Sequence, residues 1–238
     1  KFFKHGKEKF IRAAKEVILS GGAVNSPHIL QVSGIGPSDH LMNIGINVVH
    51  HLPGVGANLQ DHYVARVSHR VRHAKSINSL SRGTNLLKEI ATWAFSGKGA
   101  LTFGVTSAMV FSRSREGLSS PDLQLLFTPA SYSERTLGKL EQEDGMTVAV
   151  CPVRPASRGT IMAVSSDPFV RPEIRPNYLS DPDDVRVLLA GIQQTREIFS
   201  QPALQRYSRN ETAPGIQIQT SEELESFARE NGSIIYHP

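Results

Sequence analysis

Apolar residues first gather in the short run 16–20, whose three central side chains are valine, isoleucine and leucine. A run of this length that is followed by two glycines is typical of a strand that ends in a tight turn. Residues 23–32 then carry apolar side chains at helical spacing, so the pattern predicts a strand, a glycine turn and a helix. Because ligands in α/β folds lie beyond the carboxyl ends of strands, the turn at 20–23 is a candidate ligand wall. The alternative is a plain strand-to-helix connection.

The next segment alternates short elements with loops as far as about residue 100. Small residues and Pro37 end the first helix, a second helical turn is predicted at 39–44, and 46–49 reads as another strand. Residues 53–62 are predicted to form a loop, because they contain three turn-forming residues and end in polar side chains. A longer helix is predicted from Thr84, closed by Gly97. Its apolar side chains share one face: Leu86, Leu87, Ile90 and Ala94.

Beyond about residue 100 the pattern changes to that of an antiparallel sheet in a second domain. The runs 123–127, 147–153 and 160–164 are apolar or alternating, and 155–159 is predicted to join the last two as a hairpin loop. Two capped helices follow. One has Asp181 as N-cap and Pro182 at its first position, with acidic residues in the first turn. The other starts at a Thr220 capping box and ends at Gly232. The first buries an apolar stripe: Val185, Leu188, Leu189, Ile192 and Phe199.

Composition narrows the class of protein. The chain has 238 residues, 39% of them hydrophobic, and a net charge of +4 from 26 basic and 22 acidic residues, which is typical of a folded globular protein. The basic residues near the N-terminus indicate a solvated face, and no basic stripe with interleaved aromatics supports nucleic-acid binding. The single cysteine, Cys151, excludes an internal disulfide framework and a Cys-rich zinc site. It fits a reducing compartment.

Apolar runs are all shorter than the roughly 20 residues that span a bilayer, and the first residues lack the apolar core of a signal peptide. We therefore expect a cytoplasmic protein, with peripheral association with a membrane as the alternative. The sequence starts without methionine and stops at Pro238, just after the apolar pair Ile234-Ile235. Both ends indicate an internal piece of a longer protein.

Three familiar site motifs are missing from the sequence. A Gly-x-Ser-x-Gly nucleophile elbow is absent, which excludes the usual α/β serine hydrolase. The histidines at 50, 51, 62, 69 and 73 lack the carboxylate or cysteine spacing of a metal site, so we expect no metal. Neither Gly34-Ile35-Gly36 nor Gly54-Val55-Gly56 completes a Gly-x-Gly-x-x-Gly dinucleotide fingerprint.

One long motif does stand out. Residues 16–36, Glu-Val-Ile-Leu-Ser-Gly-Gly-Ala-Val-Asn-Ser-Pro-His-Ile-Leu-Gln-Val-Ser-Gly-Ile-Gly, closely resemble the second signature of the glucose-methanol-choline (GMC) oxidoreductases. Residues 54–62, Gly-Val-Gly-Ala-Asn-Leu-Gln-Asp-His, resemble that family's flavin-contacting segment. Ser157-Arg158-Gly159-Thr160 and Asn177-Tyr178-Leu179 resemble landmarks of its substrate domain, and Tyr236-His237-Pro238 resembles the start of its catalytic-histidine motif. The resemblance covers nearly the whole chain.

The resemblance implies a fold and a division into domains. The fold would be α+β with an α/β part: a partial, Rossmann-like FAD-binding domain and a substrate domain whose mainly antiparallel sheet is backed by helices. The expected boundaries are 1–75 for the FAD-binding domain and 76–232 for the substrate domain. Residues 233–238 would begin a return segment that carries the catalytic histidine.

The resemblance also implies a cofactor and its contacts. Oxidation of an alcohol needs a hydride acceptor that no side chain provides, so FAD is expected. Carried over residue by residue, the cofactor contacts are Ser20, Gly21, Gly22, Ala23, Asn58, Leu59, His62 and Tyr236. The alternative for the glycine and asparagine positions is a pair of domain-closing turns. His237 would take the hydroxyl proton of a small alcohol substrate, a role suited to a histidine side chain, whose unperturbed pKa lies near neutrality.

The sequence departs from the family pattern in two places, and other classes remain open. The Gly-x-Gly-x-x-Gly loop that seats the ADP pyrophosphate is not present, and neither is the second catalytic His or Asn. We therefore expect this chain to be inactive alone, and the full-length protein to be the oxidoreductase. The competing classes are an FAD-containing hydroxynitrile lyase and a non-catalytic remnant.

Overall fold

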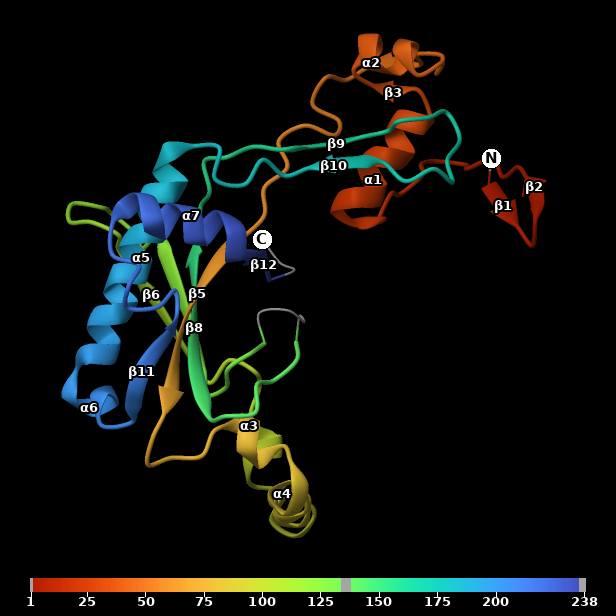
Figure 1. Ribbon diagram of the computed structural model, residues 1–238. Helices are drawn as coiled ribbons and strands as arrows, with labels where there is room; N and C mark the ends of the chain where they lie inside the picture. The colour runs from red at the N-terminus through yellow and green to blue at the C-terminus, as the bar shows by residue number, and fades with distance from the viewer. Residues whose placement is uncertain (1, 134–137, 236–238) are drawn as a thin grey trace. The chain divides into compact units, whose positions relative to one another are not determined.

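The structure is a computed structural model that describes residues 2–133 and 138–235, and it divides into two compact units (Figure 1). The first unit consists of Lys1–Leu59 and Gly159–Arg175. The second consists of Gln60–Arg158 and Pro176–Pro238. Its strand β5 begins at Tyr63, so the second unit starts earlier in the chain than the substrate domain expected from residue 76. The first unit also takes in a segment, 159–175, from within that expected domain.

The first unit is built from short elements. Helix α1 (Gly22–Val32) and the short helix α2 (Ser38–Asn43) occur close to where the sequence predicts helices. Three strand pairs accompany them. They are the antiparallel pair β1 (Phe2–Lys4) and β2 (Lys7–Lys9), the parallel pair β3 (Ile35–Gly36) and β4 (His50–His51), and the antiparallel pair β9 (Thr160–Met162) and β10 (Glu173–Arg175).

Two predicted strands of the first unit do not form. Residues 16–20 have no regular structure, and Val17 and Ile18 are 77% and 78% exposed. Residues 46–49 are likewise not a strand. The next two residues, His50 and His51, form the strand that pairs with β3 instead. A strand needs a neighbour for its backbone hydrogen bonds, and none of the described strands pairs with either run.

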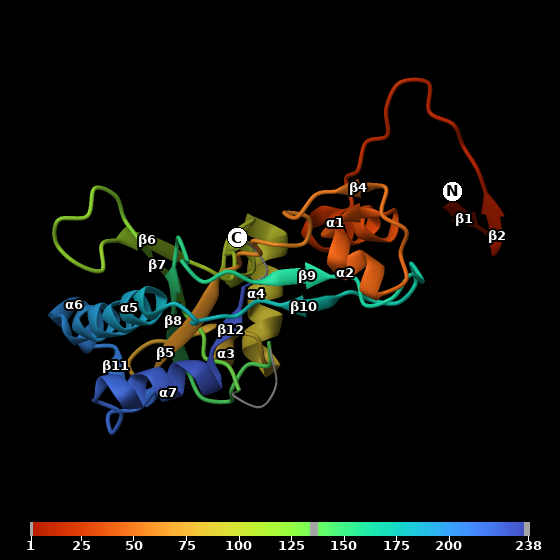
Figure 2. The same ribbon diagram turned by 90° about the horizontal axis from the view of Figure 1, so that it is seen from above.

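The second unit contains a six-stranded antiparallel sheet, and the helices at 182–200 and 221–231 cover one of its faces (Figure 1; Figure 2). The strand order is β11-β5-β8-β7-β6, and β12 also pairs with β5. The strands are β5 (Tyr63–Val71), β6 (Ala108–Ser112), β7 (Leu123–Thr128), β8 (Gly145–Pro152), β11 (Ser208–Ala213) and β12 (Ser233–Ile234). The helical elements are α3 (Ile77–Leu80), α4 (Gly83–Ser96), the 3₁₀ helix η1 (Ala100–Thr102), α5 (Pro182–Ser200), α6 (Pro202–Gln205) and α7 (Ser221–Asn231).

The predicted antiparallel sheet and both capped helices are confirmed. Asp181 caps α5, with its side chain accepting the Asp183 N–H at 2.8 Å, and Thr220 and Glu223 form a complete capping box on α7. The hairpin predicted between β8 and β9 is wrong. β8 pairs with β5 and β7, whereas β9 pairs with β10 in the other unit.

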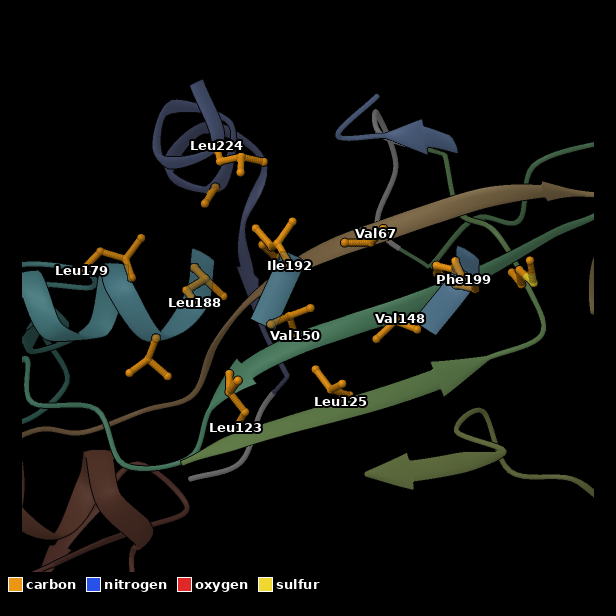
Figure 3. Close-up of a cluster of buried hydrophobic side chains, with 14 residues drawn as sticks. Val67, Leu123, Leu125, Val148, Val150, Leu179, Leu188, Ile192, Phe199 and Leu224 are labelled. Carbon is orange, nitrogen blue, oxygen red and sulfur yellow. The ribbon is translucent and has the colours of Figure 1, made fainter. Parts of the chain in front are cut away.

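The hydrophobic core of the second unit lies between the sheet and α5 and α7. Alternate residues of β5, β7 and β8 point at the helices, and Figure 3 shows Val67, Leu125 and Val150 facing Leu188 and Ile192 of α5. This close packing requires the glycine in the middle of α5. A Cβ on Gly191 would lie 2.4 Å from Val150 Cγ1. This core fixes β5, and with it the chain that leads into β5.

None of the described helices is long and apolar enough to cross a membrane. Within the described ranges, no group of three or more His, Cys, Asp or Glu side chains is arranged to hold a metal ion.

Candidate functional site

The predicted ligand turn opens α1 in the first unit. α1 begins at Gly22, whose φ is +79°, and apart from its chain neighbours and its own helix backbone no described atom lies within 4 Å of the position that its Cβ would take. The N-cap residue Gly21 has no side chain to cap this helix start, and its own N–H donates to Ser26 Oγ at 3.0 Å. The four residues 20–23 are all exposed. The turn is therefore open backbone at the positive end of a helix, which a flat or anionic group can approach.

The other end of α1 is fixed by a buried glutamine that the sequence analysis missed. Gln31 is fully buried, and its Nε2 donates to Ile161 O at 2.9 Å and to Val55 O at 3.4 Å. Its Oε1 accepts the Ala163 N–H at 2.6 Å. One side chain thus ties α1 to β9 and to the loop 53–59. Glutamine is usually a surface residue, and its partner lies 130 residues away, so the sequence gives no signal of this role.

The loop 53–59 turns at a glycine that has no room for a side chain. Gly56 has φ of +85°, and a Cβ there would lie 2.2 Å from Ile161 O and 2.3 Å from Gln31 Nε2. Its own carbonyl accepts the Ile161 N–H at 2.7 Å. The preceding Gly54, in contrast, has open space around it. Gly56 is therefore required by packing within the unit.

Asn58 and Leu59 follow directly and are held in different ways. Asn58 has φ of +62°, and its side chain is exposed. Leu59 is half-buried and exchanges two backbone hydrogen bonds with Gly159, each 2.9 Å long. Asparagine tolerates the left-handed conformation better than most residues, so the loop presents the Asn58 amide without large strain. The result is a rigid loop with one exposed amide.

His62 lies in the second unit, just before β5. Its side chain is 7% exposed, and its Nε2 lies 3.0 Å from Val153 O. Its backbone N–H donates to Asp61 Oδ1 at 2.9 Å. The imidazole therefore helps to anchor the start of β5 against the end of β8.

The same loop end carries a carboxylate–phenol pair that the sequence analysis also missed. Tyr178 donates to Asp61 Oδ2 at 2.6 Å, and its ring stacks on Tyr63 with centroids 5.0 Å apart. Burial, followed by the hydrogen bond to Asp61, raises the pKa of Tyr178. Burial likewise raises the pKa of Tyr63, whose hydroxyl donates to Ala228 O at 2.9 Å. Both phenols therefore stay protonated over the physiological range and act as hydrogen-bond donors.

The landmark loop at 155–159 is held by the first turn of α5. The buried Asp184 carboxylate accepts the N–H groups of Ala156 and Ser157 at 2.7 and 2.8 Å. Ser157 Oγ in turn accepts the Asp181 N–H at 3.0 Å. The sequence predicts Asp184 only as an acidic residue in the first turn of the helix. In the structure it also holds the loop 155–159 in place.

The predicted catalytic His237 and its neighbour Tyr236 lie outside the described residues. The chain that leads to them is described. β12 pairs antiparallel with the start of β5, with Ile234 opposite Tyr63 and Ser233 opposite Val64. Arg66 of β5 donates to Ser233 Oγ at 2.5 Å. The segment before His237 is therefore paired with the strand that follows His62.

The structure places the other predicted site residues in separate units. Ser20, Gly21, Gly22, Ala23, Asn58 and Leu59 belong to the first unit, and His62 belongs to the second. Their shared role as cofactor contacts stays a prediction.

Comparison with known proteins agrees with the motif residues. Two sequence models described as GMC oxidoreductase match residues 2–64 and 155–238. The oxygen-dependent choline dehydrogenase of Chromohalobacter salexigens is 37% identical over 238 residues, covering 100% of this chain and 42% of that protein. The mitochondrial choline dehydrogenase of Homo sapiens is 37% identical over 243 residues, covering 100% of this chain and 40% of that protein. The chain thus spans well under half the length of these curated relatives.

Solved structures share the fold. A crystal structure of formate oxidase superimposes with a TM-score of 0.84 at 24% identity, covering 95% of this chain and 44% of that one. Pyridoxine 4-oxidase from Mesorbium loti superimposes with a TM-score of 0.72 at 22% identity, covering 91% of this chain and 38% of that one.

Proposed function

The chain belongs to the GMC oxidoreductase family, and from that premise we propose that the whole protein oxidises the CH–OH group of a small alcohol. FAD is the cofactor of this family. The observation that carries the proposal is that the two family matches contain all the predicted site residues: one covers 20–62 and the other reaches His237.

The residues present fit a flavin on two structural grounds. The backbone at Gly22 is exposed and has open space beside it at the start of α1, so it can lie against a ring or an anionic group. The Asn58 amide is exposed on a loop that Gly56 and Leu59 hold in place. In the first unit, Ser20, Gly21, Gly22, Ala23, Asn58 and Leu59 would contact the cofactor. We propose His62 and Tyr236 as further contacts.

The chemistry divides between the cofactor and one histidine. When bound, the flavin ring supplies the acceptor for the hydride from the carbinol carbon. His237 takes the hydroxyl proton on an imidazole nitrogen as the C–O bond gains double-bond character. The unperturbed pKa of a histidine side chain, near 6.5, suits a base that works at neutral pH.

The test is the visible spectrum of the whole protein under nitrogen, before and after addition of primary alcohols. Choline and pyridoxine belong in the panel because relatives are named for them. We expect one alcohol to bleach the flavin. His237→Ala should slow bleaching by roughly 10²–10⁴-fold, the usual contribution of a general base. His50→Ala, which removes an exposed histidine of β4, is the matched control and should bleach at the normal rate.

Other results would point elsewhere. Release of cyanide from a cyanohydrin without bleaching would identify a lyase instead. A protein that carries flavin but is bleached by no alcohol would contradict the proposed reaction, and equal rates for wild type and His237→Ala would contradict the assigned base.

A further inference from the structure

The chain that leads to the proposed base passes from α7 into the sheet through a short junction (Figure 1). α7 ends at Asn231, Gly232 is its C-cap, and β12 begins at the next residue, Ser233. β12 has two residues, and they pair with Val64 and Tyr63 of β5. Two paired residues supply few backbone hydrogen bonds, so the position of this segment depends on the side chains around it.

One tyrosine side chain fills the junction. The Tyr63 hydroxyl donates to Ala228 O at 2.9 Å, and Arg229 O lies 3.3 Å from it. This phenol therefore caps the carbonyl end of α7. Its ring lies where the chain turns, because a Cβ on Gly232 would be 2.2 Å from the ring carbon Cζ. The φ of Gly232 is −71°, so the glycine is required by this close approach and not by its backbone angle.

The Tyr63 ring is held in turn by a second tyrosine and a carboxylate. Tyr178 stacks on it with centroids 5.0 Å apart, and the Tyr178 hydroxyl donates to Asp61 Oδ2 at 2.6 Å. The other oxygen of Asp61 accepts the His62 N–H at 2.9 Å. The same carboxylate thus orients the proposed cofactor contact His62 and the stack that fills the junction.

Two further hydrogen bonds flank the junction. Arg229 of α7 donates to Leu179 O at 2.9 Å, and Arg66 of β5 donates to Ser233 Oγ at 2.5 Å. Four residues of chain, from Ser233 to His237, span at most about 14 Å. A shift of the junction therefore passes to the base through a short piece of chain.

We propose that Tyr63 is a positioning residue for the base. It holds the junction at Gly232, so that the chain leading to His237 stays paired with the strand that follows His62. This role rests on the proposed function, since it concerns the base of that reaction. A general base has to lie within hydrogen-bond reach of the proton that it takes, and a displacement of about 1 Å can lower a rate about 100-fold.

The experiment measures anaerobic flavin reduction in the whole protein over a range of concentrations of the responsive alcohol. Tyr63→Phe removes one hydroxyl and keeps the ring, and Gly232→Ala forces a Cβ against that ring. We expect Tyr63→Phe to lower the limiting rate about tenfold, because it loses the hydrogen bond to α7. The half-saturating alcohol concentration and the flavin content should stay unchanged. Gly232→Ala should be slower still, and the double variant no slower than Gly232→Ala, because both changes open the same junction.

Each substitution has a matched control in the same unit. Tyr207→Phe makes the same change at the other end of β5, where the Tyr207 carbonyl accepts the Arg72 N–H at 2.8 Å. Gly104→Ala adds a Cβ that, apart from chain neighbours, would come no closer than 3.9 Å to a described atom. Both controls should be reduced at the wild-type rate.

A second measurement does not depend on the reaction. Hydrogen exchange of the backbone amides, resolved by peptide, reports local opening. In Tyr63→Phe the peptides that cover 228–238 should exchange faster than in the wild type, whereas those of α5 and β8 should not change. Tyr207→Phe should leave the exchange of 228–238 as it is in the wild type.

The outcomes separate this role from the proposed reaction. A wild-type flavin that no alcohol reduces contradicts the reaction, and the role of Tyr63 with it. A wild type that is reduced, and a Tyr63→Phe variant with the same limiting rate, overturn the role of Tyr63 alone. Unchanged exchange at 228–238 in Tyr63→Phe would also overturn it, as would a change confined to the half-saturating concentration or the flavin content.

Discussion

Gly56 is the residue on which the candidate cofactor loop most depends. It combines a left-handed backbone with carbonyl and amide atoms of Ile161 and Gln31 where a Cβ would stand. Its neighbour Gly54 has neither constraint. The two glycines sit in the same short motif, yet only one of them is needed for packing. At this scale the sequence predicts a loop, but it does not say which glycine fixes it.

Gly56→Ala is therefore expected to lower the free energy of unfolding by about 3 kcal/mol, because backbone strain is added to a displaced β9. Urea denaturation followed by circular dichroism measures the change. Gly54→Ala is the matched control and should alter stability by less than about 0.5 kcal/mol. Equal effects at the two positions would contradict the packing argument.

At the scale of elements, β5, α5 and β11 meet at a buried histidine. The ring of His69 in β5 lies tilted against that of Phe199 in α5 with centroids 4.2 Å apart, and its Nδ1 lies 2.7 Å from Ser208 Oγ of β11. Glu211 Oε2 is 3.8 Å from its Nε2, but Arg196 already holds that carboxylate. Burial lowers the pKa of His69 from its usual 6.5, Glu211 opposes this shift, and Arg196 adds to it. The native state therefore holds the imidazole neutral.

This predicts a definite pH dependence of stability. The unfolded chain takes up a proton near 6.5, and the folded chain does so only at lower pH. The contribution is fully present above 6.5 and is lost as the pH falls from there toward the folded pKa, by at most about 1.4 kcal/mol per pH unit. His69→Gln should flatten this part of the curve. Urea midpoints measured from pH 7 down to pH 5 check it, and an unchanged slope in the variant would show that other groups are responsible.

Elements whose signals are local could be predicted, and those that depend on distant partners could not. The capping residues of α5 and α7 lie within a few residues of the helices that they start, and both predicted caps are confirmed. Residues 16–20 and 46–49 have strand-like composition, but no described strand pairs with them. β5 was not predicted, although its residues Arg66, Ser68 and Arg70 fall at alternate positions, which is the pattern of a strand with one buried face. For α4 the apolar stripe was recognised, but its exposure could not be read from spacing alone.

At the scale of the whole molecule, the motifs carried more information about function than the geometry of individual side chains. Contiguous motifs located the turn at 20–23, the loop at 54–62 and the family. Contacts that join distant residues were missed: Gln31 with Ile161, and Asp61 with Tyr178 across 117 residues. The proposed role of His237 as the base rests on its sequence motif alone, because the residue lies outside the described ranges. All of this chain matches a choline dehydrogenase, but the match covers only 42% of that protein. Activity therefore has to be tested on the whole protein.

The central claim is that the whole protein transfers a hydride from an alcohol carbon to a bound flavin. The most direct test is the rate of anaerobic flavin reduction with the responsive alcohol, compared with the same alcohol carrying deuterium on its carbinol carbon. We expect slower reduction with the deuterated alcohol, because the bond between the carbinol carbon and the transferred hydrogen breaks in this step. A protein without flavin, or a flavin that no alcohol reduces, would contradict it.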